Sequence, residues 1–308
     1  MTQRPLIAVV GAGLMGHGIA WIFAAAGSPV RLHDPSPEAR ATAPAKLSEI
    51  SALLGRGAQA AERVTLCVTL NEAVAGAGFV FEAAPENLAL KREIFAELCR
   101  LAPPDAVLCT NTSALPIGQI SQGLACADRI VGTHFWNPPH LVPLVEVVEV
   151  EGVNGAAIAP VMALLAAAGR HPVHVRKDVP GFIGNRLQHA LKREAIALVA
   201  AGVCDAETVD DVVKLGFGRR LAVLGPLEQS DLVGLDLTVA IHETLMPDLD
   251  RTDRVHPYLA ARVAAGELGM RTGQGFRRWT AESAAAVRKR LADFLAESAR
   301  AETQEQES

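Results

Sequence analysis

The sequence predicts an α/β fold, in which a parallel, doubly wound β-sheet occupies the first two-thirds of the chain and an all-helical domain follows. Two observations carry this prediction. Short apolar runs rich in β-branched residues alternate with amphipathic segments of helical length up to about residue 180, which is the pattern of βαβ units. Beyond Pro180 and Gly181, nearly all of the periodicity is helical.

Eight apolar runs are the strand candidates. They are residues 5–10, 29–34, 63–68, 78–84, 106–111, 129–135, 141–150 and 171–176. Segments with helical periodicity lie between most of them, as in residues 87–102 and 155–169. Because strands that alternate with helices pair in parallel, these runs predict a doubly wound sheet.

The chain changes character near residue 180. The long helical segments after this point are residues 185–202, 206–216 and 255–269. We therefore expect one domain over residues 1–180 and a helical domain over residues 181–295. Residues 296–308 lose the apolar face, so we expect a disordered tail there.

The composition is that of a soluble globular protein. Of the 308 residues, 50% are hydrophobic and 20% are charged, and the formal net charge is -5. No basic patch suggests binding to nucleic acid. No apolar run reaches the ~18 residues of a membrane span, and the first ten residues enter a strand too early for a signal peptide. We therefore expect a cytoplasmic protein without a membrane partner.

The cysteines do not indicate a disulfide framework or a metal site. Their number is odd and no two have the CxxC spacing of a zinc site. We expect them to be small core residues. The five are Cys67, Cys99, Cys109, Cys126 and Cys204.

A glycine-rich turn, "VVGAGLMGHG", directly follows the first strand and opens the helical segment 14–27. Gly11 permits a tight turn, Gly13 lets a diphosphate approach the backbone, and Gly16 lets helix and strand pack closely. The helix N-terminus offers free N–H groups to phosphates. Glycines that only punctuate a turn are the alternative, but the context favours a Rossmann-type dinucleotide site. The expected cofactor contacts here are Gly11, Gly13, Leu14, Met15 and Gly16.

Asp34 ends the second strand, about twenty residues after the turn, where an acid binds the two ribose hydroxyls of a dinucleotide. Its carboxylate would repel a 2′-phosphate, and no arginine immediately follows it. The sequence therefore favours NAD over NADP.

His134 and Glu146 are candidates for a catalytic pair. His134 lies at the carboxyl end of the sixth strand candidate, the edge where open parallel sheets bind ligands. An imidazole can accept a proton near neutral pH, and a carboxylate orients it and stabilises its charged form. The alternative for His134 is a histidine buried in the core, and the alternative for Glu146 is an outward-facing strand residue. Strand alternation puts Glu146 and Glu149 on opposite faces, so at most one of them points at His134.

Seven motifs in order resemble the 3-hydroxyacyl-CoA dehydrogenase family over nearly the whole chain. They are "GAGLMG", "PENLALKREIF", "TNTSALPI", "HFWNPPHLVPLVEVV", "DVPGFIGNRL", "GPLEQSDLVGLD" and "GMRTGQGF". The resemblance implies that His134 is the general base and that Glu146 orients it. It also implies that Ser113 and Asn185 contact the oxygens of the substrate, and that the helical domain makes the protein a homodimer.

The resemblance further implies cofactor contacts at Glu86, Lys91, Ser113 and Asn137. In "MRTGQGF" the family typically has lysine where Arg271 stands, which puts this residue's cofactor contact in doubt. Other interpretations remain for some of these residues. Ser113 could cap a helix, Asn185 could be an ordinary first-turn residue, and the charges of the PEN segment could belong to a solvated helix start.

The resemblance implies an NAD-dependent enzyme that oxidises the hydroxyl of a 3-hydroxyacyl-CoA in fatty acid metabolism. Residues 35–64 contain scattered charges and no concentrated cradle for coenzyme A phosphates. "NPPHLVPLVEVV" more closely resembles relatives that act on small hydroxy compounds, such as L-gulonate or a pyridine carboxylate. A free hydroxy acid, carnitine-like or hydroxymethyl-pyridine compound is therefore the alternative substrate, and an NAD-binding protein without turnover is the rival function.

Overall fold

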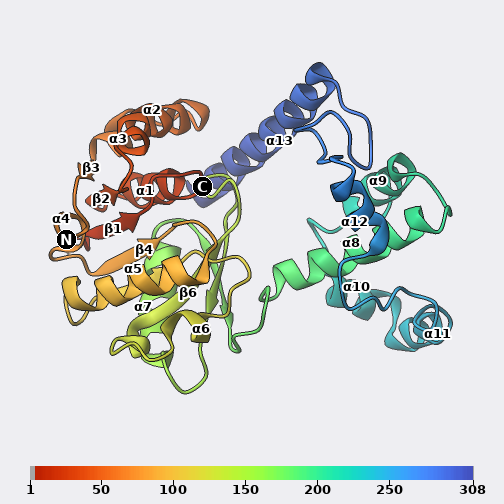
Figure 1. The fold of residues 1–308 in the computed structure, drawn as a ribbon, viewed down its shortest axis with the longest axis horizontal. Coiled ribbons are helices and arrows are strands. Elements are labelled where there is room, and N and C mark those ends of the chain that lie inside the picture. Colours follow the sequence, from red (N-terminus) through yellow and green to blue (C-terminus); the bar gives the residue numbers. More distant parts are fainter. Residues whose placement is uncertain (1–3, 308) are drawn as a thin grey trace. The chain divides into compact units, whose positions relative to one another are not determined.

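A computed structural model describes residues 4–307 and shows two compact units (Figure 1). The first unit holds the residues up to Arg186 and those from Leu291 onward, and the second is Leu187–Arg290. The sequence placed its boundary near residue 180. The division falls later, and Asn185, which bonds to Ser113, lies in the first unit.

An eight-stranded sheet forms the centre of the first unit, in the order β3-β2-β1-β4-β5-β6-β7-β8. The strands are β1 (Ile7–Val10), β2 (Val30–His33), β3 (Val64–Cys67), β4 (Phe79–Glu82), β5 (Val107–Thr110), β6 (Ile130–Phe135), β7 (Leu144–Val148) and β8 (His171–Val175). Each lies within one of the predicted runs, and the predicted fold class is confirmed. The order reverses beside β1, so the sheet is doubly wound.

One strand pair departs from the expected parallel arrangement. β6 and β7 are antiparallel, while every other neighbouring pair is parallel. Only residues 136–143 connect these two strands, and a parallel pair needs a crossover of about a dozen residues or more. The short connection therefore forces β7 to run back along β6.

Helices cover both faces of the sheet. They are α1 (Gly16–Ala25), α2 (Pro37–Leu53), α3 (Gln59–Glu62), α4 (Leu70–Val74), α5 (Leu88–Leu101), α6 (Ile117–Ser121) and α7 (Gly155–Ala167), with a 3-10 turn at Ala127–Arg129. One apolar layer contains residues of α1, α2 and α7, and the other contains residues of α4, α5 and α6. Strand β4 contributes side chains to both layers. The ring of Phe81 packs against that of Phe23, tilted by 35° with the centroids 4.6 Å apart, while Val80 belongs to the layer of Phe95.

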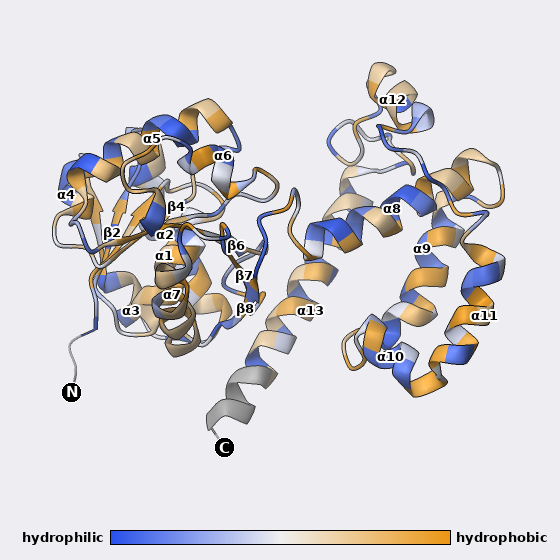
Figure 2. Cartoon of the chain, turned by 90° about the horizontal axis from the view of Figure 1, so that it is seen from below, coloured by the Kyte–Doolittle hydropathy of each residue, from blue (hydrophilic) through white to orange (hydrophobic). Residues whose placement is uncertain are grey.

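The second unit is helical and has almost no core of its own. Its helices are most of α8 (Gly184–Ala200), then α9 (Ala206–Leu215), α10 (Pro226–Val233), α11 (Leu235–Leu245), α12 (Pro257–Ala264) and the start of α13 (Ala281–Glu307), with a 3-10 turn at Phe217–Arg219. Within Leu187–Arg290, all of it described, Ala284 is the single buried apolar side chain. Apolar positions recur along these helices (Figure 2), and Val223 and Leu227 are both 80% exposed.

The C-terminal segment departs from the sequence prediction. Where a disordered tail was expected from residue 296, α13 continues to Glu307, and residue 308 lies outside the described residues. Alanine, glutamate, arginine and glutamine are strong helix formers, which supports this extension. The helix also contacts the rest of its unit, because Arg300 donates to the carbonyl of Leu53 at 2.6 Å.

Two cysteines form a disulfide that the sequence did not predict. Cys99 near the end of α5 and Cys126 before the 3-10 turn are bonded, with their Cα atoms 5.6 Å apart. They are 27 residues apart and the fold alone brings them together, so their spacing gave no signal. Among residues 4–307, no helix is long and apolar enough to cross a membrane.

Candidate active site

His134 and Glu146 form a buried hydrogen-bonded pair. The antiparallel register of β6 and β7 sets them directly opposite each other. His134 Nδ1 lies 2.8 Å from Glu146 Oε2, and the two residues are 4% and 1% exposed. A carboxylate at this distance favours the tautomer with its proton on Nδ1, which leaves Nε2 as a proton acceptor.

Glu146 is also held by the backbone before and at the start of α8. Its other oxygen, Oε1, accepts the N–H groups of Ile183 (2.9 Å) and Gly184 (3.0 Å). Burial raises the pKa of this carboxyl, but the hydrogen bond from His134 and these two N–H groups outweigh it and lower the pKa below its usual value. Glu146 is therefore ionised at neutral pH, and its negative charge faces the imidazole of His134.

Glu149 does not take part in this pair. Its Oε2 lies 2.8 Å from Nε2 of His174, a partly exposed residue of β8. The period-2 alternation of side chains accounts for the difference between the two glutamates, because positions three apart on an extended chain project to opposite faces.

Aromatic rings enclose His134. The ring of Trp136 lies 5.2 Å from the imidazole and that of Phe182 lies 5.7 Å away, measured between centroids. Trp136 also packs on the backbone of Gly184, where an added Cβ would stand 2.3 Å from the indole. Glycine is therefore required here if the chain is to reach both Trp136 and Glu146.

Ser113 and Asn185 are brought together by a direct hydrogen bond. Asn185 Nδ2 donates to the carbonyl oxygen of Ser113 at 2.9 Å. Ser113 is exposed and follows β5 at the carboxyl edge of the sheet. It is not the cap of the next helix, because α6 begins at Ile117 with Pro116 in the cap position.

The three glycines of the dinucleotide turn differ in their surroundings. A Cβ on Gly11 (φ 103°) would meet the carbonyl oxygen of Ala83 at 2.7 Å, and one on Gly16 would meet that of Gly11 at 1.7 Å. Both are required by close backbone packing. Gly13 has no atom within 4 Å of an added Cβ, and neighbouring Leu14 is 66% exposed. The turn is therefore open where a diphosphate would approach it, which fits the predicted cofactor.

Asp34 joins this turn to the end of β2. Its Oδ2 accepts the N–H of Ala12 and its Oδ1 accepts that of Ser36, both at 2.8 Å. No arginine directly follows Asp34 in the sequence. In the structure, however, Arg40 of α2 lies beside Asp34, and its Nη1 donates to the Asp34 carbonyl oxygen at 2.5 Å. A guanidinium and the predicted ribose-binding carboxylate therefore lie at the same edge.

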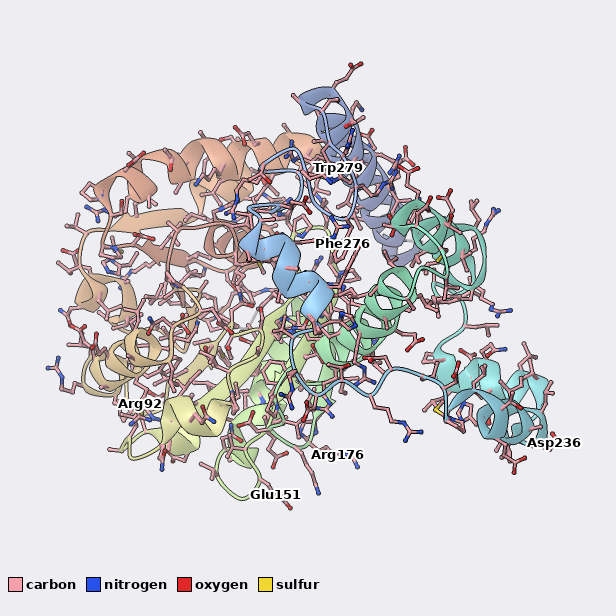
Figure 3. The ribbon with its side chains drawn as sticks, turned by 45° about the vertical axis from the view of Figure 1, so that its right-hand side comes forward. Arg92, Glu151, Arg176, Asp236, Phe276 and Trp279 are labelled. Atoms are coloured by element: carbon pink, nitrogen blue, oxygen red, sulfur yellow. A yellow bond between two sulfur atoms is a disulfide. The ribbon has the colours of Figure 1, made fainter. Side chains whose placement is uncertain are left out.

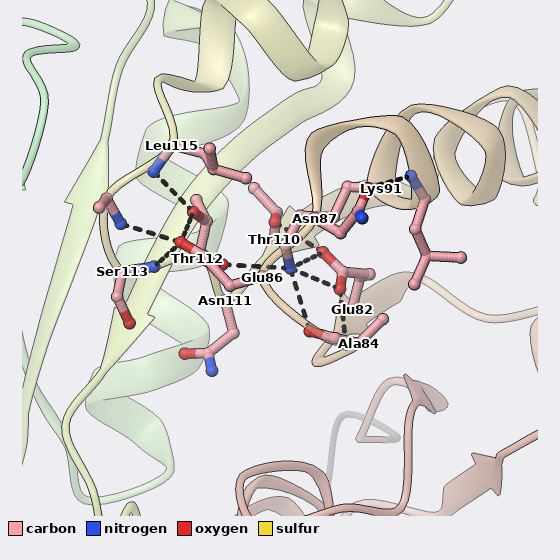
Figure 4. Close-up of polar contacts among 12 residues, drawn as sticks. Glu82, Ala84, Glu86, Asn87, Lys91, Thr110, Asn111, Thr112, Ser113 and Leu115 are labelled. Atoms are coloured by element: carbon pink, nitrogen blue, oxygen red, sulfur yellow. Dashed lines mark hydrogen bonds and ion pairs between the residues drawn. The ribbon is translucent and has the colours of Figure 1, made fainter. Parts of the chain in front are cut away.

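Glu86 and Lys91, both expected to contact the cofactor, have different environments (Figure 4). The Glu86 side chain is 40% exposed, whereas that of Lys91 is completely buried. Lys91 Nζ pairs with Glu82 at the end of β4, 2.8 Å from Oε1 and 3.0 Å from Oε2. Lys91 is therefore not part of a solvated helix start.

For two further predicted cofactor residues, no hydrogen bond within the described part of the chain fixes a role. Asn137 is exposed and precedes Pro138 through a cis peptide bond. Arg271 is exposed in the second unit, in the segment between α12 and α13. Later in that segment Arg277 lies over the ring of Trp279 and pairs with Glu207 and Asp210 of α9; Trp279 is labelled in Figure 3.

Glu82 and Asn111 were not among the residues predicted from the sequence. Glu82 is a carboxylate inside the apolar strand run "GFVFEAA", the same kind of signal that marked Glu146 in "LVPLVEVVE". Asn111 follows β5, and its Oδ1 accepts the N–H of Phe135 at 2.9 Å. It thereby ties together the strand ends that carry Ser113 and His134.

Comparison with known sequences identifies the family. Residues 6–179 match the description "3-hydroxyacyl-CoA dehydrogenase, NAD binding domain" and residues 181–279 match "3-hydroxyacyl-CoA dehydrogenase, C-terminal domain". The chain belongs to the 3-hydroxyacyl-CoA dehydrogenase family. It is thus an NAD-dependent oxidoreductase that acts on CH–OH groups, and the resemblance noted in the sequence is confirmed.

Curated relatives in this family carry different substrate names. The chain is 35% identical to a 5-formyl-3-hydroxy-2-methylpyridine 4-carboxylate 5-dehydrogenase of Mesorhizobium japonicum, over 94% of this chain and 95% of that one. It is 39% identical to a probable 3-hydroxybutyryl-CoA dehydrogenase of Bacillus subtilis, over 88% and 96%. It is 40% identical to an L-carnitine dehydrogenase of Streptomyces coelicolor, over 74% and 73%.

Solved structures include enzymes named for two of these substrates. A crystal structure of the pyridine carboxylate dehydrogenase, described as an NAD+ dependent dismutase, superposes with a TM-score of 0.90 at 33% identity, covering 98% of this chain and 99% of that one. The (S)-3-hydroxybutyryl-CoA dehydrogenase of Ralstonia eutropha superposes with a TM-score of 0.73 at 30% identity, covering 90% and 100%.

The packing of Trp136 on Gly184 is testable. Gly184→Ala places a methyl group against the indole, and we expect a loss of about 1–3 kcal/mol in the free energy of unfolding, the usual cost of overpacking. Thermal and urea unfolding measure this loss. Gly57→Ala is the matched control, because a Cβ there would meet no atom within 4 Å. Equal stability of the two variants would contradict the contact.

Proposed function

We propose that this protein oxidises the hydroxyl group of a 3-hydroxyacyl-CoA to the 3-keto form with NAD, using His134 as the general base and Glu146 as the group that orients it. The observation that carries the proposal is the buried 2.8 Å hydrogen bond between His134 Nδ1 and Glu146 Oε2. This pair stands at the carboxyl end of β6. The glycine turn follows β1, which is parallel to β6 within the sheet, so both lie at the same edge.

The proton and the electron pair of the reaction have separate destinations. The substrate hydroxyl gives its proton to His134 Nε2, and the same carbon loses a hydride, which leaves a carbonyl group. NAD supplies the hydride acceptor when bound. The resulting imidazolium is stabilised by the ionised Glu146.

In this proposal, other residues of the chain bind and orient the substrate and the cofactor. Ser113 and the Asn185 amide, already in contact, would hold the oxygens of the substrate. Gly11, Gly13, Leu14, Met15 and Gly16 would take the diphosphate and Asp34 the ribose hydroxyls, with Glu86, Asn137 and Arg271 as further cofactor contacts. We also propose that the reaction takes place in the cytoplasm, as a step of fatty acid metabolism when the substrate is an acyl-CoA.

A free hydroxy compound is the second candidate substrate. The observation that favours it is the fit to the pyridine carboxylate dehydrogenase, whose TM-score of 0.90 exceeds the 0.73 of the hydroxybutyryl-CoA enzyme. A substrate panel decides between the two: 3-hydroxybutyryl-CoA, L-gulonate, carnitine and hydroxymethyl-pyridine acids, each assayed with NAD at 340 nm. We expect the CoA thioester to have the highest kcat/KM, and a higher value for any other compound overturns that assignment.

We further propose a homodimer built through the helical domain predicted over residues 181–295. The helices within Leu187–Arg290 expose apolar side chains along their length and bury almost none. A unit of this size without an apolar core is unstable alone, and a second copy presents the same apolar faces to cover it.

Replacement of the catalytic pair tests the mechanism. His134→Ala is expected to lower kcat by about 10²–10⁴, the usual contribution of a general base. Glu146→Gln keeps the shape but removes the charge that stabilises the imidazolium, and we expect a loss of about tenfold or more. NADH formation measures both effects. Glu149→Gln serves as the control and should keep full activity, because the Glu149 carboxylate bonds to His174 and not to His134.

The outcome separates an enzyme from a binding protein. A His134→Ala variant that keeps its fold and loses less than tenfold would show that His134 is not the base. A wild-type protein that binds NADH but oxidises none of the panel would favour the rival function of NAD binding without turnover.

Cofactor choice is expected to depend on Asp34. Asp34→Ser removes the carboxylate that would repel a 2′-phosphate and leaves Arg40 beside the site. We expect NADH affinity to fall and NADPH affinity to rise, each by about tenfold, since a hydrogen bond to a charged group contributes about 1.5–3 kcal/mol. Fluorescence titration gives both dissociation constants. The gain should vanish when Arg40→Ala is added, and its persistence would contradict a role for Arg40.

The oligomeric state can be measured directly. Light scattering after gel filtration should give twice the chain mass of 32.5 kDa. Val223→Asp combined with Leu227→Asp, both on exposed apolar positions, should shift the protein toward the monomer. A stable monomer of the unmodified chain would contradict the dimer.

A further inference from the structure

Lys91 is a fully buried cation whose donors are all engaged. Its ammonium group contacts Glu82 Oε1 at 2.8 Å, Glu82 Oε2 at 3.0 Å and the carbonyl of Ala84 at 3.3 Å. An ammonium group carries three N–H donors, so none remains for a cofactor. Moving Lys91 toward a ligand would also leave the carboxylate of Glu82 buried and unpaired, which is strongly unfavourable.

Glu82 has further partners that fix it in place (Figure 4). The hydroxyl of Thr110 on the neighbouring strand β5 donates to Oε2 at 2.7 Å, and the N–H of Ala84 donates to Oε1 at 2.6 Å. Glu82 therefore links the ends of β4 and β5 and the start of the segment 83–87. Lys91 connects this linkage to the first turn of α5.

The same segment carries Glu86 to the loop of Ser113. Glu86 Oε1 accepts the hydroxyl of Thr112 at 2.6 Å and the N–H groups of Ser113 (2.9 Å) and Ala114 (3.1 Å). Burial raises the pKa of Glu86, but these three hydrogen bonds and the charge of Lys91, 3.8 Å away, outweigh it and lower the pKa. Glu86 therefore stays ionised and holds the backbone that positions Ser113.

We propose that Lys91 is a positioning residue that does not touch the cofactor: paired with Glu82 beneath the 83–87 segment, it fixes Glu86 and, through Glu86, the Ser113 loop. The inference rests on the proposed function only in that Glu86 and Ser113 serve the active site. It replaces the expected cofactor contact of Lys91 with an indirect role.

Rescue by a second substitution distinguishes the two roles. Lys91→Met removes the cation and leaves Glu82 unpaired, so we expect the melting temperature to fall by on the order of 10 °C and NADH affinity to fall by about tenfold or more. Adding Glu82→Gln removes the unpaired charge and leaves a neutral side chain that can still bond to Thr110. We expect the double variant to recover most of both losses.

A direct cofactor contact gives the opposite result, because removal of Glu82 cannot restore a lost bond to NADH. A double variant that is as unstable as Lys91→Met, or that regains stability but not NADH affinity, overturns the proposal. Lys177→Met is the control, since Lys177 is exposed and should change neither quantity. Melting temperature and NADH titration need no substrate, so they decide the question even if no compound of the panel is oxidised.

Discussion

The antiparallel pairing of β6 with β7 is the constraint on which the proposed catalytic pair depends. It sets His134 opposite Glu146, although twelve residues separate them in the chain. A slip of one residue in this register would send Glu146 to the other face of the sheet. The N–H groups of Ile183 and Gly184 then fix the second carboxylate oxygen. Three segments thus converge on one carboxylate, and the orientation of the imidazole follows from it.

Two buried carboxylates on this sheet are stabilised in the same way but have different partners. Glu146 and Glu82 each accept backbone N–H groups and each has a nitrogen partner. The partner of Glu82 is the ammonium group of Lys91, held by both carboxylate oxygens, so this pair is suited to support its surroundings. The partner of Glu146 is an imidazole, which ordinarily gains or loses a proton near neutral pH. The nature of the partner therefore suits one pair to support its surroundings and the other to the proton transfer that we propose.

Local sequence patterns predicted most of the fold and pointed to the residues of the proposed catalytic pair. The alternation of apolar runs located all eight strands, and the order of strand, turn and helix located the glycine turn. The short connection after β6 also indicates that β7 runs antiparallel to β6, but the prediction of a parallel sheet did not take this connection into account. The helical extension of α13 shows that loss of an apolar face does not remove intrinsic helix propensity.

What could not be predicted depends on contacts between distant residues. Cys99 and Cys126 meet only because α5 packs beside the loop that leads to β6. Lys91 stands in a sequence typical of a solvated helix start, and only the neighbouring end of β4 shows that its charge is buried. Arg40 returns to Asp34 through the first turn of α2, which spacing alone did not reveal. In each case the local sequence did not reveal which distant residue the side chain would contact.

The division of tasks within the first unit explains how one family includes relatives named for a CoA thioester, for carnitine and for a pyridine carboxylate. His134, Glu146 and the glycine turn are fixed by strand register, backbone N–H groups and close glycine packing. None of these constraints involves a group that would recognise the rest of a substrate. The reacting CH–OH group can therefore be held in the same way, while residues outside the pair adapt to whatever that group is attached to.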